Sequence, residues 1–244
     1  MRGKIFCLIS IVPQNGAKYL ATNLGYFIKK NKKTKKKKVL LIDFDFANPT
    51  LCHHFVDSST YNIDNLSLME EDLNFELFRR AVVKTKLGFD ILKGTKVCNS
   101  EIFSRDVIAK ILNLAKEIYD YIFVVANPQV SNSATIVTLL NANKVILVAK
   151  NDYTNDFKFK DVLASIGSFI KNKSDIKLVY NCVNFFHKTK IVEKVKEYNV
   201  SSITILDYVP KSIDNINLDK KLPMKKRTIN DKKFKKLSKE LITE

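Results

Sequence analysis

Apolar positions along the chain fall into two alternating patterns. Short runs rich in β-branched residues have no polar break, which is typical of parallel strands buried on both faces. Between them, apolar residues recur every three to four positions, the spacing of one face of a helix. The predicted strands are residues 4–10, 38–44, 89–92, 121–126, 144–149, 176–181 and 203–209. The predicted helices are residues 17–30, 104–118, 133–141, 154–171, 188–198 and 232–242.

This alternation predicts β-α-β units, in which parallel strands are joined by right-handed crossovers. We therefore expect an α/β fold, a doubly wound and mostly parallel sheet with helices on both faces. No linker rich in Pro, Gly or Ser divides the sequence, so residues 1–244 are expected to form a single domain. In such sheets ligands bind at the carboxyl ends of the strands, which directs attention to the residues that follow each strand.

Two strand ends carry candidate chemistry. After the first strand, Gly16 opens a predicted helix, where backbone N–H groups can bind a phosphate. The loop does not match the G-x-x-x-x-G-K-[ST] motif, and an ordinary strand-to-helix turn is the alternative. Asp43 and Asp45 follow the second strand. Because an isolated buried carboxylate is costly, these two side chains either serve a site or cap a turn.

The order of these segments resembles the ParA/MinD family of deviant P-loop ATPases over nearly the whole chain. The family pattern is a glycine-rich phosphate loop opening a helix, a strand ending in D-x-D, a later strand D-Y-I-I-I-D-x-P-P, and a nucleotide-facing Asn and Pro after the last strands. The resemblance implies a P-loop NTPase-like fold of the SIMIBI class. The matching segments are Gly16, Asn23-Leu24-Gly25, residues 39–45, residues 120–128, Asn181 and Pro210.

Several positions that hold phosphate and metal in the family are replaced here. In the register of the resemblance, Val12 and Ala17 stand where the family has lysines, and Lys18 stands where a Ser or Thr ligates Mg²⁺. Val125 replaces the Walker B carboxylate, whereas Asp43, which positions the attacking water in the family, survives. Because phosphoryl transfer depends on those charges and on the metal, the resemblance implies a pseudo-ATPase that keeps Asp43 as a residual catalytic side chain. An active ATPase for partition or septum positioning is the alternative.

One branch of the family, the TadZ/CpaE proteins that localise pilus-assembly machinery, is similar in the loop region. Gly16-Ala17 followed by residues 20–25 matches that branch, including Ala in place of the loop Lys. Residues 88–94 are similar to a second segment of the branch. This similarity implies a homodimeric scaffold that positions a pilus, secretion or other cell-envelope machine.

The resemblance also assigns the positions that face a nucleotide. Two alternatives stay open for them, namely ATP bound weakly or without Mg²⁺, and no cofactor. No resident metal is expected, because an ammonium group cannot ligate a cation. The candidate cofactor-binding residues are Asn15, Gly16, Ala17, Lys18, Tyr19, Asn181 and Pro210.

Charge suggests a further partner. The chain has 42 basic and 25 acidic residues, a net charge of +17, and almost all of the excess is Lys. A diffuse solvated field is one explanation, and attraction to DNA or to an anionic membrane is the other. Residues 29–38 hold eight lysines, and the basic C-terminal segment, residues 220–244, holds ten basic side chains. In that segment Phe234, Leu237 and Leu241 form an apolar stripe, which either docks on the sheet or contacts a membrane.

These basic segments also leave open a third function, a nucleic-acid-binding module that uses no nucleotide. The four cysteines are widely separated and form no C-x-x-C pair, which is typical of a reducing compartment. We therefore expect a cytoplasmic protein, peripheral at the inner face of the membrane if the basic segments bind lipid. The run Cys52-His53-His54 gives only a weak metal signal.

Overall fold

The computed structural model describes residues 3–55, 61–97, 103–170, 172, 175–198, 200, 202–210 and 228–243. Within these ranges, the strands form an 8-stranded sheet in the order β3-β4-β2-β5-β1-β6-β7-β8. All neighbouring strands in it are parallel except the pair β3 and β4. The strands are β1 (Lys4–Ser10), β2 (Val39–Phe44), β3 (Val82–Lys84), β4 (Asp90–Leu92), β5 (Tyr121–Ala126), β6 (Lys144–Ala149), β7 (Ile176–Val183) and β8 (Ser202–Asp207).

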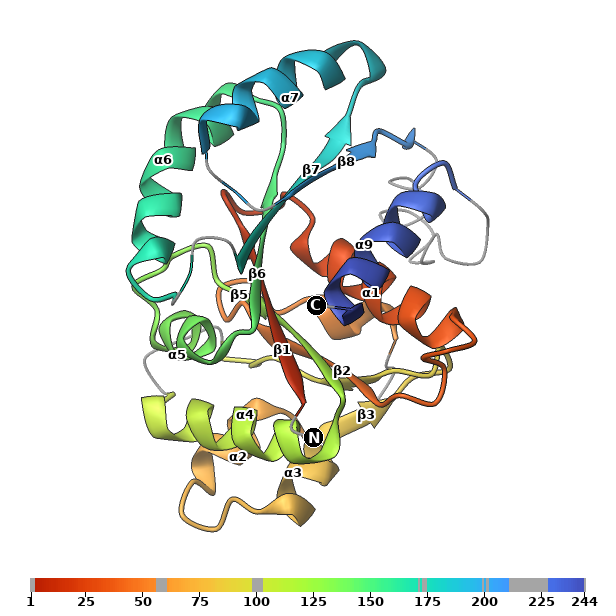
Figure 1. Cartoon of the computed structure of the whole chain (residues 1–244). Helices are drawn as coiled ribbons and strands as arrows, with labels where there is room; N and C mark the ends of the chain where they lie inside the picture. Colours follow the sequence, from red (N-terminus) through yellow and green to blue (C-terminus); the bar gives the residue numbers. More distant parts are fainter. Residues whose placement is uncertain are drawn as a thin grey trace.

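Helices cover both faces of the sheet (Figure 1). They are α1 (Ala17–Lys30), α2 (Ile63–Leu68), α3 (Phe75–Ala81), α4 (Arg105–Ile118), α5 (Ser133–Asn141), α6 (Tyr153–Gly167), α7 (Lys188–Val195) and α9 (Asp231–Thr243). Short 3-10 turns are Leu51–His54, Phe185–His187 and Lys196–Tyr198. α1 and α9 pack on one face, whereas α4, α5, α6 and α7 pack on the other, with α2 and α3 beside α4.

The central strands are apolar throughout because both of their faces are covered. In β1, Phe6 and Leu8 pack in the core under α1 and α9, whereas Ile5, Cys7 and Ile9 pack under the helices of the opposite face. All five side chains are fully buried. The predicted fold class, a doubly wound and mostly parallel sheet with helices on both faces, is confirmed.

The region between β2 and β4 holds elements that the sequence pattern did not predict. The helices α2 and α3 have six and seven residues, which is too short for a clear helical period. Their signal was instead the N-cap, since Asn62 accepts a hydrogen bond from Asp64 N and Asn74 accepts from Glu76 N. The strand β3, also unpredicted, pairs antiparallel with β4 at the edge of the sheet.

Several predicted boundaries were wrong. The strand predicted over residues 203–209 ends at Asp207, and the helix predicted over residues 188–198 ends at Val195, where a 3-10 turn follows. The helix predicted over residues 154–171 ends at Gly167, and the strand predicted over residues 176–181 continues to Val183. The continuation passes through an irregularity in the pairing of β7 with β8, where Cys182 has a left-handed φ of 57°. Periodicity could not predict this extension, because a bulge interrupts the alternation of faces.

The apolar stripe of the C-terminal helix is docked on the sheet. Phe234, Leu237 and Leu241 are each 1% exposed, and the ring of Phe234 stacks on Phe27 of α1 with centroids 5.8 Å apart. The stripe is therefore buried against α1 and is not presented to a membrane, which decides between the two predicted alternatives. Residues 220–227 lie outside the described residues. None of the helices in the described ranges has the length and hydropathy that a bilayer crossing needs.

Candidate functional site

The loop between β1 and α1 has a backbone that reverses sharply before the helix. Gln14 and Gly16 both have left-handed φ values, of 64° and 101°. A Cβ atom on Gly16 would lie 2.3 Å from Nδ2 of Asn181, so the position requires glycine for its conformation and for its space. The structure therefore places Gly16 and Asn181, two of the candidate cofactor-binding residues, close against each other.

The N-terminus of α1 leaves backbone donors available. For the N–H groups of residues 14–19 no acceptor is found among the described residues, and Leu20 is the first to bond into the helix, to Gly16 O at 2.9 Å. Pro13 supplies no N–H group, so the loop offers fewer donors than a glycine-rich loop would. Such unpaired N–H groups at a helix start can bind an anion.

Buried amide side chains hold the loop in place. Asn15 donates from Nδ2 to Val148 O at 3.1 Å and to Oδ1 of Asn155 at 2.5 Å. Asn155, at the start of α6, donates in turn to both carboxylate oxygens of Asp152 at 2.9 Å. Asn181 donates from Nδ2 to Asn15 O at 2.9 Å. The structure thus brings Asn15, Gly16 and Asn181 together, but the amides of Asn15 and Asn181 are engaged in fixing the loop.

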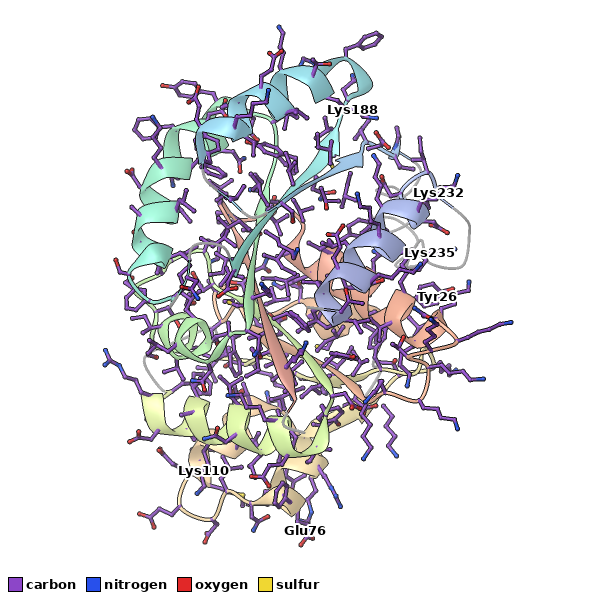
Figure 2. The ribbon with its side chains drawn as sticks, in the orientation of Figure 1. Tyr26, Glu76, Lys110, Lys188, Lys232 and Lys235 are labelled. Atoms are coloured by element: carbon purple, nitrogen blue, oxygen red, sulfur yellow. The ribbon has the colours of Figure 1, made fainter. Side chains whose placement is uncertain are left out.

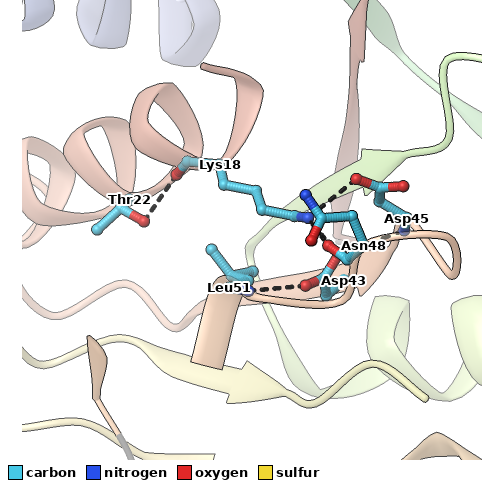
Figure 3. A network of polar contacts seen from close by, with 6 residues as sticks. All are labelled: Lys18, Thr22, Asp43, Asp45, Asn48 and Leu51. Carbon is cyan, nitrogen blue, oxygen red and sulfur yellow. Dashed lines mark hydrogen bonds and ion pairs between the residues drawn. The ribbon is translucent and has the colours of Figure 1, made fainter. Parts of the chain in front are cut away.

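Lys18 turns away from the loop toward the end of β2 (Figure 3). Its ammonium lies 2.9 Å from Oδ2 of Asp45 and 3.9 Å from Oδ1 of Asp43, and it also donates to the backbone oxygen of Asn48. The Lys18 side chain is 19% exposed. The side chain that the sequence places at the phosphate loop is therefore held by two carboxylates at the end of β2, a strand that β5 separates from β1.

Asp43 is the most enclosed of these groups, at 1% exposed. It accepts hydrogen bonds from Leu51 N at 2.8 Å and from Asp45 N at 3.3 Å. Burial raises the pKa of Asp43 to about 7, and the positive charge of Lys18 and the Leu51 N–H group partly oppose that rise. Gly94 closes the other side, since a Cβ there would lie 3.0 Å from Asp43 O.

The residues at this edge do not fit a magnesium ion. Mg²⁺ requires oxygen ligands in near-octahedral geometry, usually one or two carboxylates and several waters. Here Lys18 supplies no acceptor, its ammonium is paired with Asp43 and Asp45, and the neighbouring strand presents the apolar Val125 beside Asp43. Among the described residues, no group of three or more His, Cys, Asp or Glu is placed to hold a metal.

The other predicted residues lie apart from this constellation. Ala17 is buried in the core beneath the loop, and the ring of Tyr19 packs edge-on against Phe234 of α9 at 5.8 Å. Pro210 is exposed after β8. Tyr19 thus contacts α9 instead of contributing a side chain to the loop.

Asp152 and Asn155 are the residues that sequence reasoning missed. Their signal was local: Asp152 caps α6 and accepts from Asn155 N at 2.9 Å, which is the spacing of an N-cap pair. That Asn155 also reaches Asn15 is a long-range contact that no local pattern contains. For the Cys52-His53-His54 run, the side chains of His53 and His54 lie outside the described residues, as does Cys98.

Comparisons with known proteins give a fold. No family model matches the chain, and no curated protein matches its sequence. Among solved structures, a ParA family ATPase from Chlorobium tepidum superimposes with a TM-score of 0.81 at 15% identity, covering 96% of this chain and 98% of that one. A Borrelia burgdorferi protein described as a plasmid partition protein, bound to AMPPNP, gives a TM-score of 0.78 at 16% identity, with 99% of each chain covered.

A third similar structure is the septum site-determining protein MinD from Pyrococcus horikoshii, complexed with Mg-ADP. It gives a TM-score of 0.74 at 17% identity and covers 98% of this chain and 96% of that one. At these identities the comparisons establish the fold and nothing finer. The chain has the fold of ParA- and MinD-type ATPases, as the order of its segments predicted.

Proposed function

We propose that this protein is a degenerate ParA/MinD-like ATPase that acts as a positioning scaffold instead of hydrolysing ATP. The observation that carries the proposal is the position of Lys18, whose ammonium is engaged by Asp43 and Asp45 at the end of β2. The loop above it then has no lysine for a phosphate group, and the carboxylates have no vacant face for a metal. The similarity of the loop to the TadZ/CpaE branch supports a pilus, secretion or other cell-envelope machine as the partner.

The missing groups are those on which phosphoryl transfer depends. Stabilising the transferred phosphoryl group takes lysine, metal and precisely held dipoles, because the protein does little covalent chemistry itself. Each lost electrostatic contact costs about 3 kcal/mol, which is about a hundredfold in rate. With Val12, Ala17, Lys18 and Val125 at the four family positions, an active ATPase is disfavoured, although Asp43 remains at the strand end.

Nucleotide binding without hydrolysis is compatible with the loop. The N–H groups of residues 14–19 point to an anion site at the start of α1. Without a lysine or a metal as counter-charge, ATP would bind weakly and independently of Mg²⁺. The alternative, a loop that binds no cofactor, is supported by the amide network that already fills part of the site around Asn15.

A surface rich in exposed lysines favours a partner that carries negative charge. We use the name basic surface for the exposed lysines at the end of α1, in the following loop and on α9. Tyr26 of α1 and Lys232 and Lys235 of α9 lie on the same side of the molecule (Figure 2). Because the apolar stripe of α9 is buried, attachment there would be electrostatic and sensitive to salt. An anionic membrane or DNA is the partner that this surface fits. The basic surface consists of Lys30, Lys32, Lys33, Lys35, Lys36, Lys37, Lys38, Lys232, Lys235, Lys236 and Lys239.

Phosphate release from ATP tests the proposal directly. We expect no Mg²⁺-dependent release above buffer from the wild-type protein. A steady rate that Asp43→Ala abolishes and that the exposed-site control Asp106→Ala retains would contradict it. Thermal unfolding with ATP or ADP, with and without Mg²⁺, then separates the two cofactor alternatives. Ligand at a hundred times its dissociation constant would stabilise the protein by about 2.7 kcal/mol.

A further inference from the structure

The strand-end carboxylates share one internal cation. The ammonium of Lys18 lies 2.9 Å from Oδ2 of Asp45 and 3.9 Å from Oδ1 of Asp43, and it donates as well to Asn48 O (Figure 3). An ammonium has three donors and no acceptor; here it donates to Asp45 and to Asn48 O, and it forms an ion pair with Asp43. Two carboxylates and the backbone oxygen of Asn48 surround the ammonium, as oxygen ligands surround a metal ion. Here the cation is covalently attached to α1.

The surroundings of this group are closed. Asp43 is 1% exposed, its second oxygen accepts from Leu51 N at 2.8 Å, and Gly94 packs against its backbone. A metal ion bound by both carboxylates would have to displace the ammonium, because it would need the oxygens that the ammonium contacts and would be repelled by its charge. The Lys18 side chain, which is 19% exposed, would then become more exposed to solvent.

We infer that the Lys18 ammonium is a tethered cation that takes the place of a divalent metal at Asp43 and Asp45. The Pyrococcus horikoshii MinD structure of the same fold is complexed with Mg-ADP, so this fold accommodates that ion in another chain. In this chain, the attached ammonium excludes the metal, and an anion at the β1–α1 loop is bound without one. The inference deepens the proposed function and rests on it for its biological meaning.

The tether has an advantage that a free ion lacks. A metal must be taken from solution and must give up part of its hydration shell, whereas Lys18 is delivered by the first turn of α1. The local concentration of such an attached group does not depend on the Mg²⁺ in solution, since linking two groups makes their encounter intramolecular. Removing the ammonium while adding an oxygen should therefore create a metal site from the carboxylates that remain.

A titration with Mn²⁺ alone, followed by the electron paramagnetic resonance signal of the free ion, tests the inference. The variants are Lys18→Ser, which adds a hydroxyl oxygen, and Lys18→Gln, which is neutral and of similar length. We expect no stoichiometric binding by the wild type and about one Mn²⁺ per chain in Lys18→Ser, at least tenfold tighter than wild type. Adding Asp45→Asn to Lys18→Ser should abolish that gain. Lys30→Ser, at the exposed end of α1, is the control for the change in net charge.

Two results would overturn the inference. One is stoichiometric Mn²⁺ binding by the wild type that Asp43→Asn weakens, and the other is no gain of binding in a folded Lys18→Ser or Lys18→Gln protein. If circular dichroism shows that Lys18→Ser does not fold, Lys18→Gln provides the test. The titration contains Mn²⁺ and no nucleotide, so its result does not depend on whether the protein hydrolyses ATP. A failure of the proposed function would instead appear as phosphate release from ATP.

Discussion

Lysine has opposite roles in two regions of this molecule. At the strand ends, Lys18 is largely enclosed and is shared by two carboxylates. On the basic surface, Lys232 and Lys235 project from α9 into solvent, and both are exposed (Figure 2). The same side chain therefore compensates buried charge in one place and stays hydrated at the surface in the other.

The difference follows from the local dielectric environment. A charge taken out of water needs a partner, because its attraction to that partner must replace lost hydration. An exposed charge keeps its hydration and gains little from any ion pair. The ammonium of Lys18, next to the loop that binds phosphate in other P-loop folds, is thus neutralised by Asp43 and Asp45. The lysines that are accessible to an acidic partner lie outside this loop.

The largest expected effect comes from removing the enclosed lysine. Lys18→Met keeps the length of the side chain but leaves Asp43 and Asp45 facing each other without a counter-charge. We expect the free energy of unfolding in urea to fall by about 2–3 kcal/mol at pH 8, below the full cost of breaking a buried pair because Lys18 is partly exposed. The matched variant Lys30→Met, on the same helix, should change stability by less than about 0.5 kcal/mol. Equal losses in the two variants would mean that Lys18 acts only as a helix residue.

The pH dependence of stability is expected to reflect the protonation of Asp43, beside Lys18. Burial raises the pKa of Asp43 from 3.8 to about 7, so the folded state binds its proton more tightly than the unfolded state does. The stability that this protonation contributes is complete below about pH 4 and is lost as the pH rises through about 7. The charged groups that act on Asp43 are Lys18 and Asp45. Burial raises the pKa of the nearby Cys52 thiol, and the charge of Asp43 raises it further.

Asp43→Asn isolates this contribution, because the other titrating groups cancel in the difference between the two proteins. We expect the free energy of unfolding of the wild type, relative to Asp43→Asn, to decrease between about pH 4 and pH 7. Urea titrations at several pH values measure it. A difference that is flat across that range, or that rises with pH, would show that Asp43 is ionised in the folded protein and that Lys18 outweighs burial.

A smaller effect is expected from the loop. Gly16→Ala forces a left-handed residue with a side chain against Nδ2 of Asn181, 2.3 Å away. Backbone strain and loss of the hydrogen bond to Asn15 together should cost about 2 kcal/mol. Measuring the same substitution in an Asn181→Ala background should return part of that cost, because the clash is then absent. An unchanged cost in that background would assign it to backbone conformation alone.

Sequence patterns predicted the layers of the fold better than the contacts of the site. Apolar runs such as β1 and β5 are diagnostic because burial on both faces leaves no alternative for them. The destination of Lys18 depends on a flexible side chain and on Asp45, 27 positions away. The pairing of Asn15 with Asn155 spans 140 positions. Such contacts arise only when the strands are assembled, so the sequence did not predict that the amides of Asn15 and Asn181 hold the loop in place.

The smallest expected effect on stability, and the clearest effect on binding, concerns the basic surface. The first variant replaces by Gln four exposed lysines of the loop after α1, namely Lys32, Lys33, Lys35 and Lys36. The matched control makes the same charge change on α6, α7 and the turn that follows, at Lys158, Lys160, Lys190 and Lys196. Both variants should unfold within about 0.5 kcal/mol of the wild type, because the replaced side chains are solvated.

The two variants should differ in binding to an acidic partner. If the basic surface is the attachment site, the loop variant should bind anionic vesicles or duplex DNA more weakly. For DNA, the slope of log affinity against log salt should be shallower by about 0.9 for each lost phosphate contact. The control variant should keep the affinity and slope of the wild type. Equal weakening in both would mean that the net charge of +17 acts as a diffuse field. The position of the surface lysines would then not matter for binding, in contrast to that of Lys18, whose contacts are defined.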